Sequence, residues 1–346
     1  MKRIDNKLRR YASAKGVTLV ELMVSVALGL LLMASAIGIF VSSRQVYRTE
    51  EALSRNQENG RVATYFLTRK IREAGYAGCG NLEDIKIYVM AKPPPAGGFD
   101  LGSALVGYEG DGTNGAGGNW SNPSDTIAHV AGTDILTIRH GGECGADLTG
   151  NMTSDNAEIQ LSNATQCGFQ AGDYLLITDC QTGDLFRASS VSATQVTKIN
   201  IAHANNVNIA NKLSKIYQSG STVLRFVQTT YFIGTNSDDG NISLYRIQNE
   251  GDPQELIENI EDMQLDYGVD SGNDGIVDFY RTASAVTDWD SVLSVRLNLL
   301  VRSDDNVTTG SQKVKFYSLD VNAGENADQR LRTAFSSMVT VRNRVP

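Results

Sequence analysis

The longest apolar stretch of the chain runs from Val17 to Val41, and Glu21 is its only charged residue. A helix of this length, at about 1.5 Å per residue, is roughly 37 Å long and exceeds the ~30 Å hydrocarbon core of a bilayer. A cleaved secretory signal has an apolar region of only about 7–15 residues. The pattern therefore predicts one membrane-spanning helix. It also raises a question about Glu21, because an ionised carboxylate in hydrocarbon is costly unless it has a partner.

Beyond this stretch, apolar positions recur mostly every three, four or seven residues, with charged residues between them. The recurring positions are Val46, Leu53, Ala63, Phe66, Leu67, Ile71 and Ala74. The spacing predicts that the helix continues as an amphipathic half over 42–78, and glycines at 75 and 78 predict its end near residue 75. A coiled coil is the alternative for such a stripe, but the heptads are irregular.

The rest of the chain indicates β structure. The segment 79–131 is rich in glycine, proline and asparagine and predicts a surface loop. In 132–346, runs rich in β-branched and aromatic residues alternate with turn residues, which predicts a β-rich globular domain. The runs are DILTIRH, DYLLITDC, DLFRASSV, TVLRFVQTTYFIG, ISLYRIQ, MQLDYGV, SVLSVRLNLLVRS and KVKFYSLD. The expected fold class is α+β, with a long N-terminal helix packed on an antiparallel β-rich domain.

The charge distribution orients the predicted membrane helix. The 346 residues include 31 basic and 39 acidic residues, a net charge of −8 that disfavours a nucleic-acid-binding protein. Six of the basic residues precede the apolar stretch, namely Lys2, Arg3, Lys7, Arg9, Arg10 and Lys15. Positively charged flanks stay in the cytoplasm, so residues 1–16 are expected there and the body on the other side.

The four cysteines are Cys79, Cys144, Cys167 and Cys180, with no CxxC spacing and only three histidines to complete a zinc site. In a body outside the cytoplasm they predict two disulfides, with buried free thiols as the alternative. Four cysteines allow three connectivities. The short separation of Cys167 and Cys180 favours that pair, which leaves Cys79 with Cys144.

Catalytic motifs of the HExxH, GxSxG and Walker types do not occur in the sequence, so we do not expect an enzyme or a bound cofactor. One segment, VDSGNDGIVDFY, partly resembles a calcium loop through Asp270, Asp274 and Asp278. However, Gly272 stands at the third ligand position and Arg281 at the twelfth, where the template has glutamate. A polar hairpin turn is the favoured interpretation, and a calcium site is the alternative.

The segment KGVTLVELMVSVALG resembles the class III signal of type IV pilins and type II secretion pseudopilins. The resemblance implies a leader peptide over 1–16 that ends at Gly16, a mature chain that starts at Val17 instead of the usual phenylalanine, and Glu21 as the fifth mature residue. In this family a prepilin peptidase cuts after the glycine and methylates the new amino terminus. The glutamate is thought to pair with that amine of a neighbouring subunit, which would supply the missing partner.

Both ends of the chain narrow the resemblance to PilW-type minor pilins, roughly over 1–80 and 255–346. The segments that carry it are QENGRVATYFL, REAGYAGCG, ENIEDMQLDYGVD, WDSVLSVRLNLLVRS and RLRTAFSSMVTVRNRVP. The implied protein is a pilin-like minor subunit that primes type IV pilus assembly at or near the tip and contributes to biogenesis, twitching motility and adhesion. Its implied partners are other minor pilins, the major pilin, prepilin peptidase, the inner-membrane assembly machinery and a tip adhesin.

The implied location is the inner membrane, held by the helix over 17–41 with the body in the periplasm, and later the pilus. A J-type pseudopilin of a type II secretion system is the nearest alternative, because its later strands are similar. A membrane-anchored adhesin or enzyme with an uncleaved signal anchor is an alternative from a different class. The size of the chain and the REAGYAGC segment favour the pilus.

Overall fold

The computed structural model describes residues 16–92, 103–162, 164–193, 198–249, 251–317, 319–321 and 327–344. The expected leader, apart from Gly16, and residues 93–102 of the expected loop lie outside the described residues. The chain divides into two compact units, Met1–Glu51 and Ala52–Pro346, which we describe separately.

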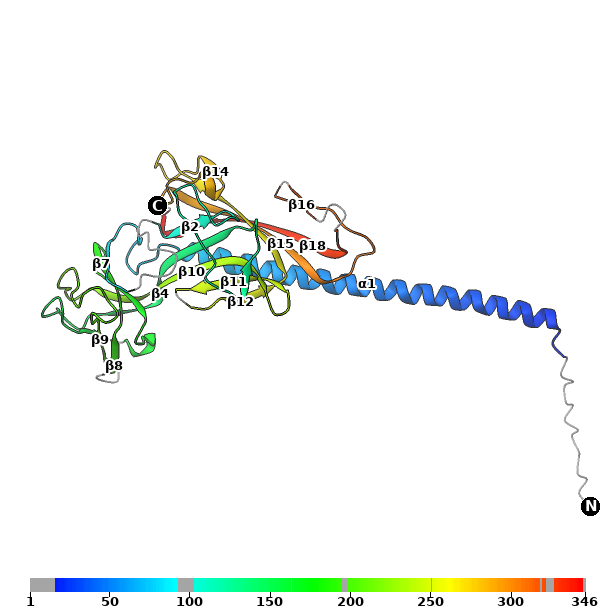
Figure 1. Cartoon of the computed structure of the whole chain (residues 1–346), viewed down its shortest axis with the longest axis horizontal. Coiled ribbons are helices and arrows are strands. Elements are labelled where there is room, and N and C mark those ends of the chain that lie inside the picture. Colours follow the sequence, from blue (N-terminus) through cyan, green and yellow to red (C-terminus); the bar gives the residue numbers. More distant parts are fainter. Residues whose placement is uncertain are drawn as a thin grey trace, which may run out of the picture. The chain divides into compact units, whose positions relative to one another are not determined.

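Helix α1 (Leu19–Glu73) is a continuous α-helix of 55 residues (Figure 1). It ends two residues before the position expected from the sequence. Gly75 follows with φ +78°, a left-handed conformation that glycine adopts without steric cost and that commonly terminates helices. In the first unit, the side chains of residues 17–41 are all exposed within the chain.

From Ala52 onward, α1 has one buried stripe, as the sequence periodicity predicts. The buried residues are Ala52, Asn56, Gly60, Ala63, Leu67 and Ile71, spaced by three or four positions. A Cβ atom on Gly60 would lie only 2.0 Å from the ring of Phe335, so a strand can approach the helix closely here because the residue is glycine. The Nδ2 of Asn56 also donates a hydrogen bond of 3.0 Å to the carbonyl of Leu331 on the same strand.

The larger sheet has nine strands with the main order β1-β7-β6-β10-β11-β12; β3 and β4 also pair with β10, and β2 pairs with β4. Its members are β1 (Lys86–Val89), β2 (Leu105–Tyr108), β3 (Ile127–His129), β4 (Ile135–Asp147), β6 (Tyr174–Thr178), β7 (Thr182–Arg187), β10 (Thr222–Asn236), β11 (Ile242–Gln248) and β12 (Gln254–Glu258). The central strand β10 pairs antiparallel with β3, β4, β6 and β11. The pairing of β1 with β7 is parallel.

The second sheet has four antiparallel strands in the order β14-β13-β15-β18. They are β14 (Phe279–Arg281), β13 (Ile260–Val269), β15 (Val292–Asn306) and β18 (Arg330–Thr340). Smaller sheets pair β16 (Val314–Phe316) with β17 (Leu319–Val321), and β9 (Lys198–Ala202) with β5 (Ile159–Ser162) and β8 (Ser190–Ala193). Short 3₁₀ helices cover Thr165–Cys167 (η1), Ala283–Ala285 (η2) and Arg342–Arg344 (η3).

The main hydrophobic core joins the helix to both large sheets. It includes Leu67 and Ile71 of α1, Phe232 of β10, and Leu265 and Leu297 of β13 and β15. The ring of Phe66 on α1 meets that of Tyr231 on β10 edge to face, with centroids 5.9 Å apart. This arrangement confirms the expected fold class, a long helix packed on an antiparallel β-rich domain.

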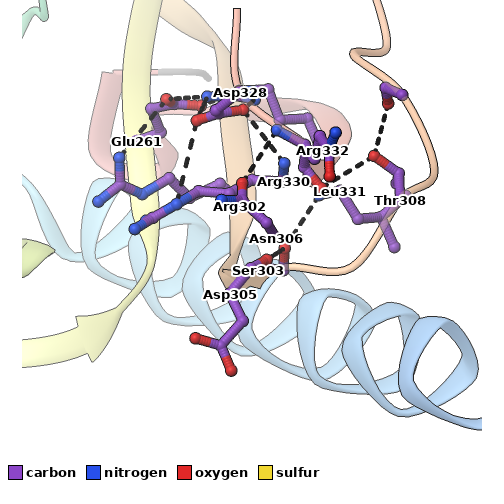
Figure 2. A network of polar contacts seen from close by, with 12 residues as sticks. Glu261, Arg302, Ser303, Asp305, Asn306, Thr308, Asp328, Arg330, Leu331 and Arg332 are labelled. Carbon is purple, nitrogen blue, oxygen red and sulfur yellow. Dashed lines mark hydrogen bonds and ion pairs between the residues drawn. The ribbon is translucent and has the colours of Figure 1, made fainter. Parts of the chain in front are cut away.

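A network of ion pairs joins β13, β15 and the start of β18 (Figure 2). Arg332, whose side chain is 5% exposed, donates to both oxygens of Glu261 at 2.6 and 2.8 Å and also binds Asp328. Arg302 of β15 lies 3.8 Å from Glu261. Because the buried guanidinium has two carboxylate partners, its desolvation is offset and the three strands are held in register.

A buried carboxylate lies between the two large sheets. Asp134, which precedes β4 and is 4% exposed, accepts a hydrogen bond of 2.8 Å from the backbone N–H of Leu265 on β13. Burial raises the pKa of Asp134 to about 8, and the nearby acidic side chains of Glu109, Asp262 and Asp266 contribute to the rise. At neutral pH this carboxyl group therefore retains its proton in the folded chain.

The structure differs from two of the expectations about the strands. The segment 79–131 contains β1, β2 and β3, and all four residues of β2 are buried against β4 and the core. The strand expected in KVKFYSLD is instead the hairpin of β16 and β17, which turns at Tyr317 with φ +47°. These short strands give little signal in a glycine-rich sequence, because pairing with distant strands stabilises them.

The cysteines form two disulfides, as expected, but the expected pairing was wrong. Cys79 pairs with Cys180 and Cys144 with Cys167, with Cα–Cα distances of 5.7 and 5.4 Å. The physical reason is strand β6, which separates Cys167 from Cys180. Five strand residues at about 3.3 Å each hold the two positions roughly 16 Å apart, much farther than the Cα distance of a disulfide.

Candidate assembly site at the start of the helix

The first turn of α1 is closed by a reciprocal pair of residues, Thr18 and Glu21. The backbone N–H of Glu21 donates to Thr18 Oγ1 at 3.2 Å. In return, Glu21 Oε2 accepts from the backbone N–H of Thr18 at 3.0 Å and from its hydroxyl at 3.1 Å. This is a capping box, in which two side chains satisfy N–H groups that have no partner within the helix.

The sequence analysis missed this cap, although the signal was present. The letters TLVE fit the pattern of serine or threonine followed three residues later by an acidic residue. From the sequence, Glu21 is a charge in an apolar run that needs a partner in another subunit. The structure gives the carboxylate a partner in its own chain, at the positive end of the helix dipole.

Only one of the two carboxylate oxygens of Glu21 takes part in the cap. Oε2 accepts both hydrogen bonds from Thr18, and within the described residues Oε1 accepts none. A cut after Gly16 would leave both members of the cap in the mature chain, because Thr18 would become its second residue. The arrangement can therefore hold Oε2 in the helix start and present Oε1 to a cation from outside the chain.

The surface that follows this turn is apolar. α1 is the one helix in the described part of the chain that is long and apolar enough to cross a membrane, with a mean hydropathy of 2.5 over 18 residues. None of those 18 residues is buried within the chain, in contrast to the core helix of a soluble protein. Such a surface requires lipid or the apolar helices of other chains to cover it.

The remaining residues singled out from the sequence lie in the second unit. Asp270 and Asp278 bind the turn that joins β13 to β14. Asp270 accepts from the backbone N–H groups of Asp274 and Gly275 at 3.2 and 2.7 Å, and Asp278 accepts from that of Ser271 at 2.8 Å. Val269 and Phe279 pair at the base of this hairpin. Nowhere in the described ranges do three His, Cys, Asp or Glu side chains gather as metal ligands. The geometry fits the polar turn better than a calcium loop.

Two protein families match the chain at the two ends that carried the resemblance. Residues 12–37 match the prokaryotic N-terminal methylation motif, and residues 230–343 match the family described as Type IV Pilus-assembly protein W, or PilW. The first match contains Glu21, and the second covers most of the strands from β10 to β18. Both matches confirm the resemblance to PilW-type minor pilins.

Among solved structures, the chain is similar to a type IV-like pilin from Thermus thermophilus. The sequence identity is 11% and the TM-score is 0.32, over 84% of this chain and 98% of that chain. A similarity this low leaves the fold to be argued from the helix and sheets described above. No curated protein matches the sequence.

Proposed function

We propose that this chain, whose two ends match the N-terminal methylation motif and the PilW family, is a minor pilin that primes pilus assembly and is incorporated at or near the tip. Pilins are structural proteins, and their role here is assembly. The observation that carries the proposal is the first turn of α1. There, Glu21 caps its own helix with one oxygen and keeps the other available at the start of a fully exposed apolar segment.

In the proposed pathway, prepilin peptidase cuts after Gly16 and methylates the amine of Val17. The capping box of Thr18 and Glu21 persists and keeps the carboxylate in a fixed rotamer. Oε1 then accepts a hydrogen bond from the methylated, protonated amine of a neighbouring subunit. Ion pairing removes the cost of each isolated charge in the apolar surroundings, so a correctly placed neighbour is favoured over any other.

The apolar half of α1 holds the chain in the inner membrane before assembly and packs against the helices of other minor pilins and the major pilin afterwards. The body resides in the periplasm, where the two disulfides can form and persist. The inner-membrane assembly machinery then extrudes the complex. Through this role the chain contributes to pilus biogenesis, twitching motility and adhesion.

The test uses Glu21→Leu and Glu21→Gln in the full chain, each at normal levels in its host. Leucine removes the charge and the half of the capping box that Glu21 supplies, whereas glutamine retains a capping acceptor and removes only the charge. Both variants should insert into the membrane, and both should be missing from sheared pili because the amine of the neighbour has no anion. Immunoblots of the sheared and membrane fractions measure this. Normal piliation, with Glu21→Gln present in the pili, would show that the charge has no assembly role.

A further inference from the structure

Strand β18 forms one edge of the four-stranded sheet. Its registered partner is β15, on one side only (Figure 1). The hairpin of β16 and β17 approaches β18, but its strands pair with each other. Across the described residues, no backbone group bonds to the outer side of the strand over 333–340.

The direction of the hydrogen bonds shows which groups are unpaired. The N–H of Val341 donates to the carbonyl of Leu293 at 2.8 Å, and Thr340 stands opposite Ser294. In an antiparallel pair, bonded and non-bonded positions alternate. The odd-numbered residues from 333 to 341 therefore bond to β15. The N–H and C=O groups of the even-numbered residues point away from the sheet, and their side chains are exposed: Ala334, Ser336, Met338 and Thr340.

This edge lacks the usual protection against pairing with other chains. Natural edge strands are short, charged, bulged or interrupted by proline. The segment 333–340, TAFSSMVT, has no charge, no proline, no glycine and no shift in its register. The other edge strands of the two large sheets are shorter: β14 and β3 have three residues, β1 and β2 have four, and β12 has five and includes two glutamates. Among the described edge strands of these two sheets, β18 is the longest, with eleven residues.

Three arginines near β18, Arg61, Arg72 and Arg342, form what we call the basic rim, and Arg72 and Arg342 line the same pocket. Gly60 of α1 lies beneath Phe335 of β18, and the next residue, Arg61, shares one side of the helix with Arg72, eleven positions later. Arg342 follows the end of β18 in η3. All three arginines are exposed, and the described part of the chain offers none of them an ion-pair partner. Glu73 and Glu143 line the same pocket as Arg72 and Arg342, but Arg69 pairs with both and Lys70 pairs with Glu73, so an excess of positive charge remains.

We propose that the edge of β18 docks an extended acidic strand of a partner protein. The partner adds a fifth strand through main-chain hydrogen bonds to Ala334, Ser336 and Met338, and its carboxylates meet the basic rim of Arg61, Arg72 and Arg342.

A second copy of β18 is the wrong partner on grounds of charge. Residues 328–342 hold three arginines, Arg330, Arg332 and Arg342, and one acidic residue, Asp328, so a second copy brings mainly positive charge to the basic rim. Like charges directly opposite each other destabilise a sheet. A partner strand that fits the edge of β18 must therefore carry acidic side chains.

The principal experiment places a photo-crosslinking phenylalanine analogue at residue 336 of the full chain in intact host cells, with Ser192 on the exposed strand β8 as the control position. Mass spectrometry of the adduct locates the partner peptide. The expected result is an adduct at 336, in excess of that at 192, to an acidic and extended segment of another protein. An adduct to a second copy, an adduct to a helical or basic segment, or no excess over position 192 would each overturn the proposal.

A matched pair of proline variants tests the hydrogen bonds, with the crosslinker moved to residue 338. Ser336→Pro removes an outward N–H, whereas Ser337→Pro removes one that bonds to β15. Ser336→Pro should reduce the adduct about tenfold, the effect of one or two lost net hydrogen bonds, without lowering the unfolding temperature as Ser337→Pro does. If Ser336→Pro does not fold, Ser336→Lys replaces it as an edge-blocking variant.

The charge of the rim is tested in the same assay. Arg342→Glu should also weaken the adduct, and Arg342→Lys should preserve it. A full yield of adduct with both Arg342→Glu and Ser336→Pro would refute docking at this edge. The readout does not require incorporation into pili, so it remains informative even if Glu21 has no assembly role.

Discussion

Within helix α1, the residues before Ala52 and those from Ala52 onward are equally helical but differ in what covers their apolar side chains. Leu30 in the earlier part is 62% exposed, whereas Leu67 in the later part is 0% exposed. The glycines differ in the same way: a Cβ atom on Gly38 would meet nothing within 4 Å, and one on Gly60 would collide with Phe335. The same secondary structure therefore has two different sources of stability.

The difference separates the part of the helix that the chain itself covers from the part whose apolar side chains it leaves exposed. From Ala52 onward, the chain supplies its own apolar cover, and only one stripe of the helix needs to be apolar. From Val17 to Val41 every side chain is exposed within the described residues, and the helix is apolar on all sides from Leu22 to Val41. Lipid or the apolar helices of other chains can provide that cover.

The largest expected effect compares Leu67→Ala with Leu30→Ala. Leu67→Ala leaves a cavity in the main core and should lower the free energy of unfolding of the body by about 4 kcal/mol. Leu30 is largely exposed, so Leu30→Ala should leave the body unchanged. Fluorescence measures this in the detergent-solubilised full chain, because both tryptophans, Trp120 and Trp289, lie in the body.

An equal loss of stability for the two leucine variants would contradict the comparison. It would mean that the helix before Ala52 stabilises the body through contacts within the chain. A normal body for both variants would instead mean that the core can close around the missing side chain of Leu67.

The sequence predicted the helix and most of the longer strands because their signals are local. An apolar run, a three-to-four periodicity and β-branched runs depend on neighbouring residues, and tertiary structure agrees with them. The β2 strand and the disulfide partners could not be predicted in this way. The strand depends on pairing with β4, and the disulfides depend on where β6 places its two ends.

The candidate site was half predictable. Gly16, Val17 and Glu21 follow from the resemblance to the class III signal, and the family match over residues 12–37 includes all three. The capping role of Glu21 could be predicted from its spacing to Thr18, whereas its charge in an apolar run indicates only a partner outside the chain. The open edge of β18 was not readable at all, because strand order within a sheet depends on which distant segments pair.

The second prediction concerns the pH dependence of the body, which the exposed part of α1 should not share. The pKa of Asp134 is raised to about 8 in the folded chain, above its ordinary value of 3.8. Between these values the folded chain holds a proton that the unfolded chain has lost. Stability is therefore full at acidic pH and falls as the pH rises toward 8, by about 3 kcal/mol between about pH 5 and about pH 7.5.

Asp134→Asn should remove this dependence, because the amide oxygen can still accept from Leu265 and does not ionise. Melting curves of the full chain at the two pH values, read by tryptophan fluorescence, give the difference between the parent and the variant. If the parent loses as much stability as the variant over this range, another group is responsible for the pH dependence of the body.

The smallest effect is expected at the first turn of α1, where Thr18→Ala separates the cap from the charge. Alanine removes the hydroxyl that accepts from the N–H of Glu21, which should destabilise the helix start by about 1 kcal/mol, and Thr18→Ser should restore the cap. The free oxygen of Glu21 survives both changes, so each variant should still appear in sheared pili, unlike Glu21→Gln. Amide hydrogen exchange at the first turn measures the cap, and immunoblots of sheared pili measure assembly. If Thr18→Ala were excluded from pili as completely as Glu21→Gln, the fixed orientation of the carboxylate, and not its charge alone, would select the neighbouring subunit.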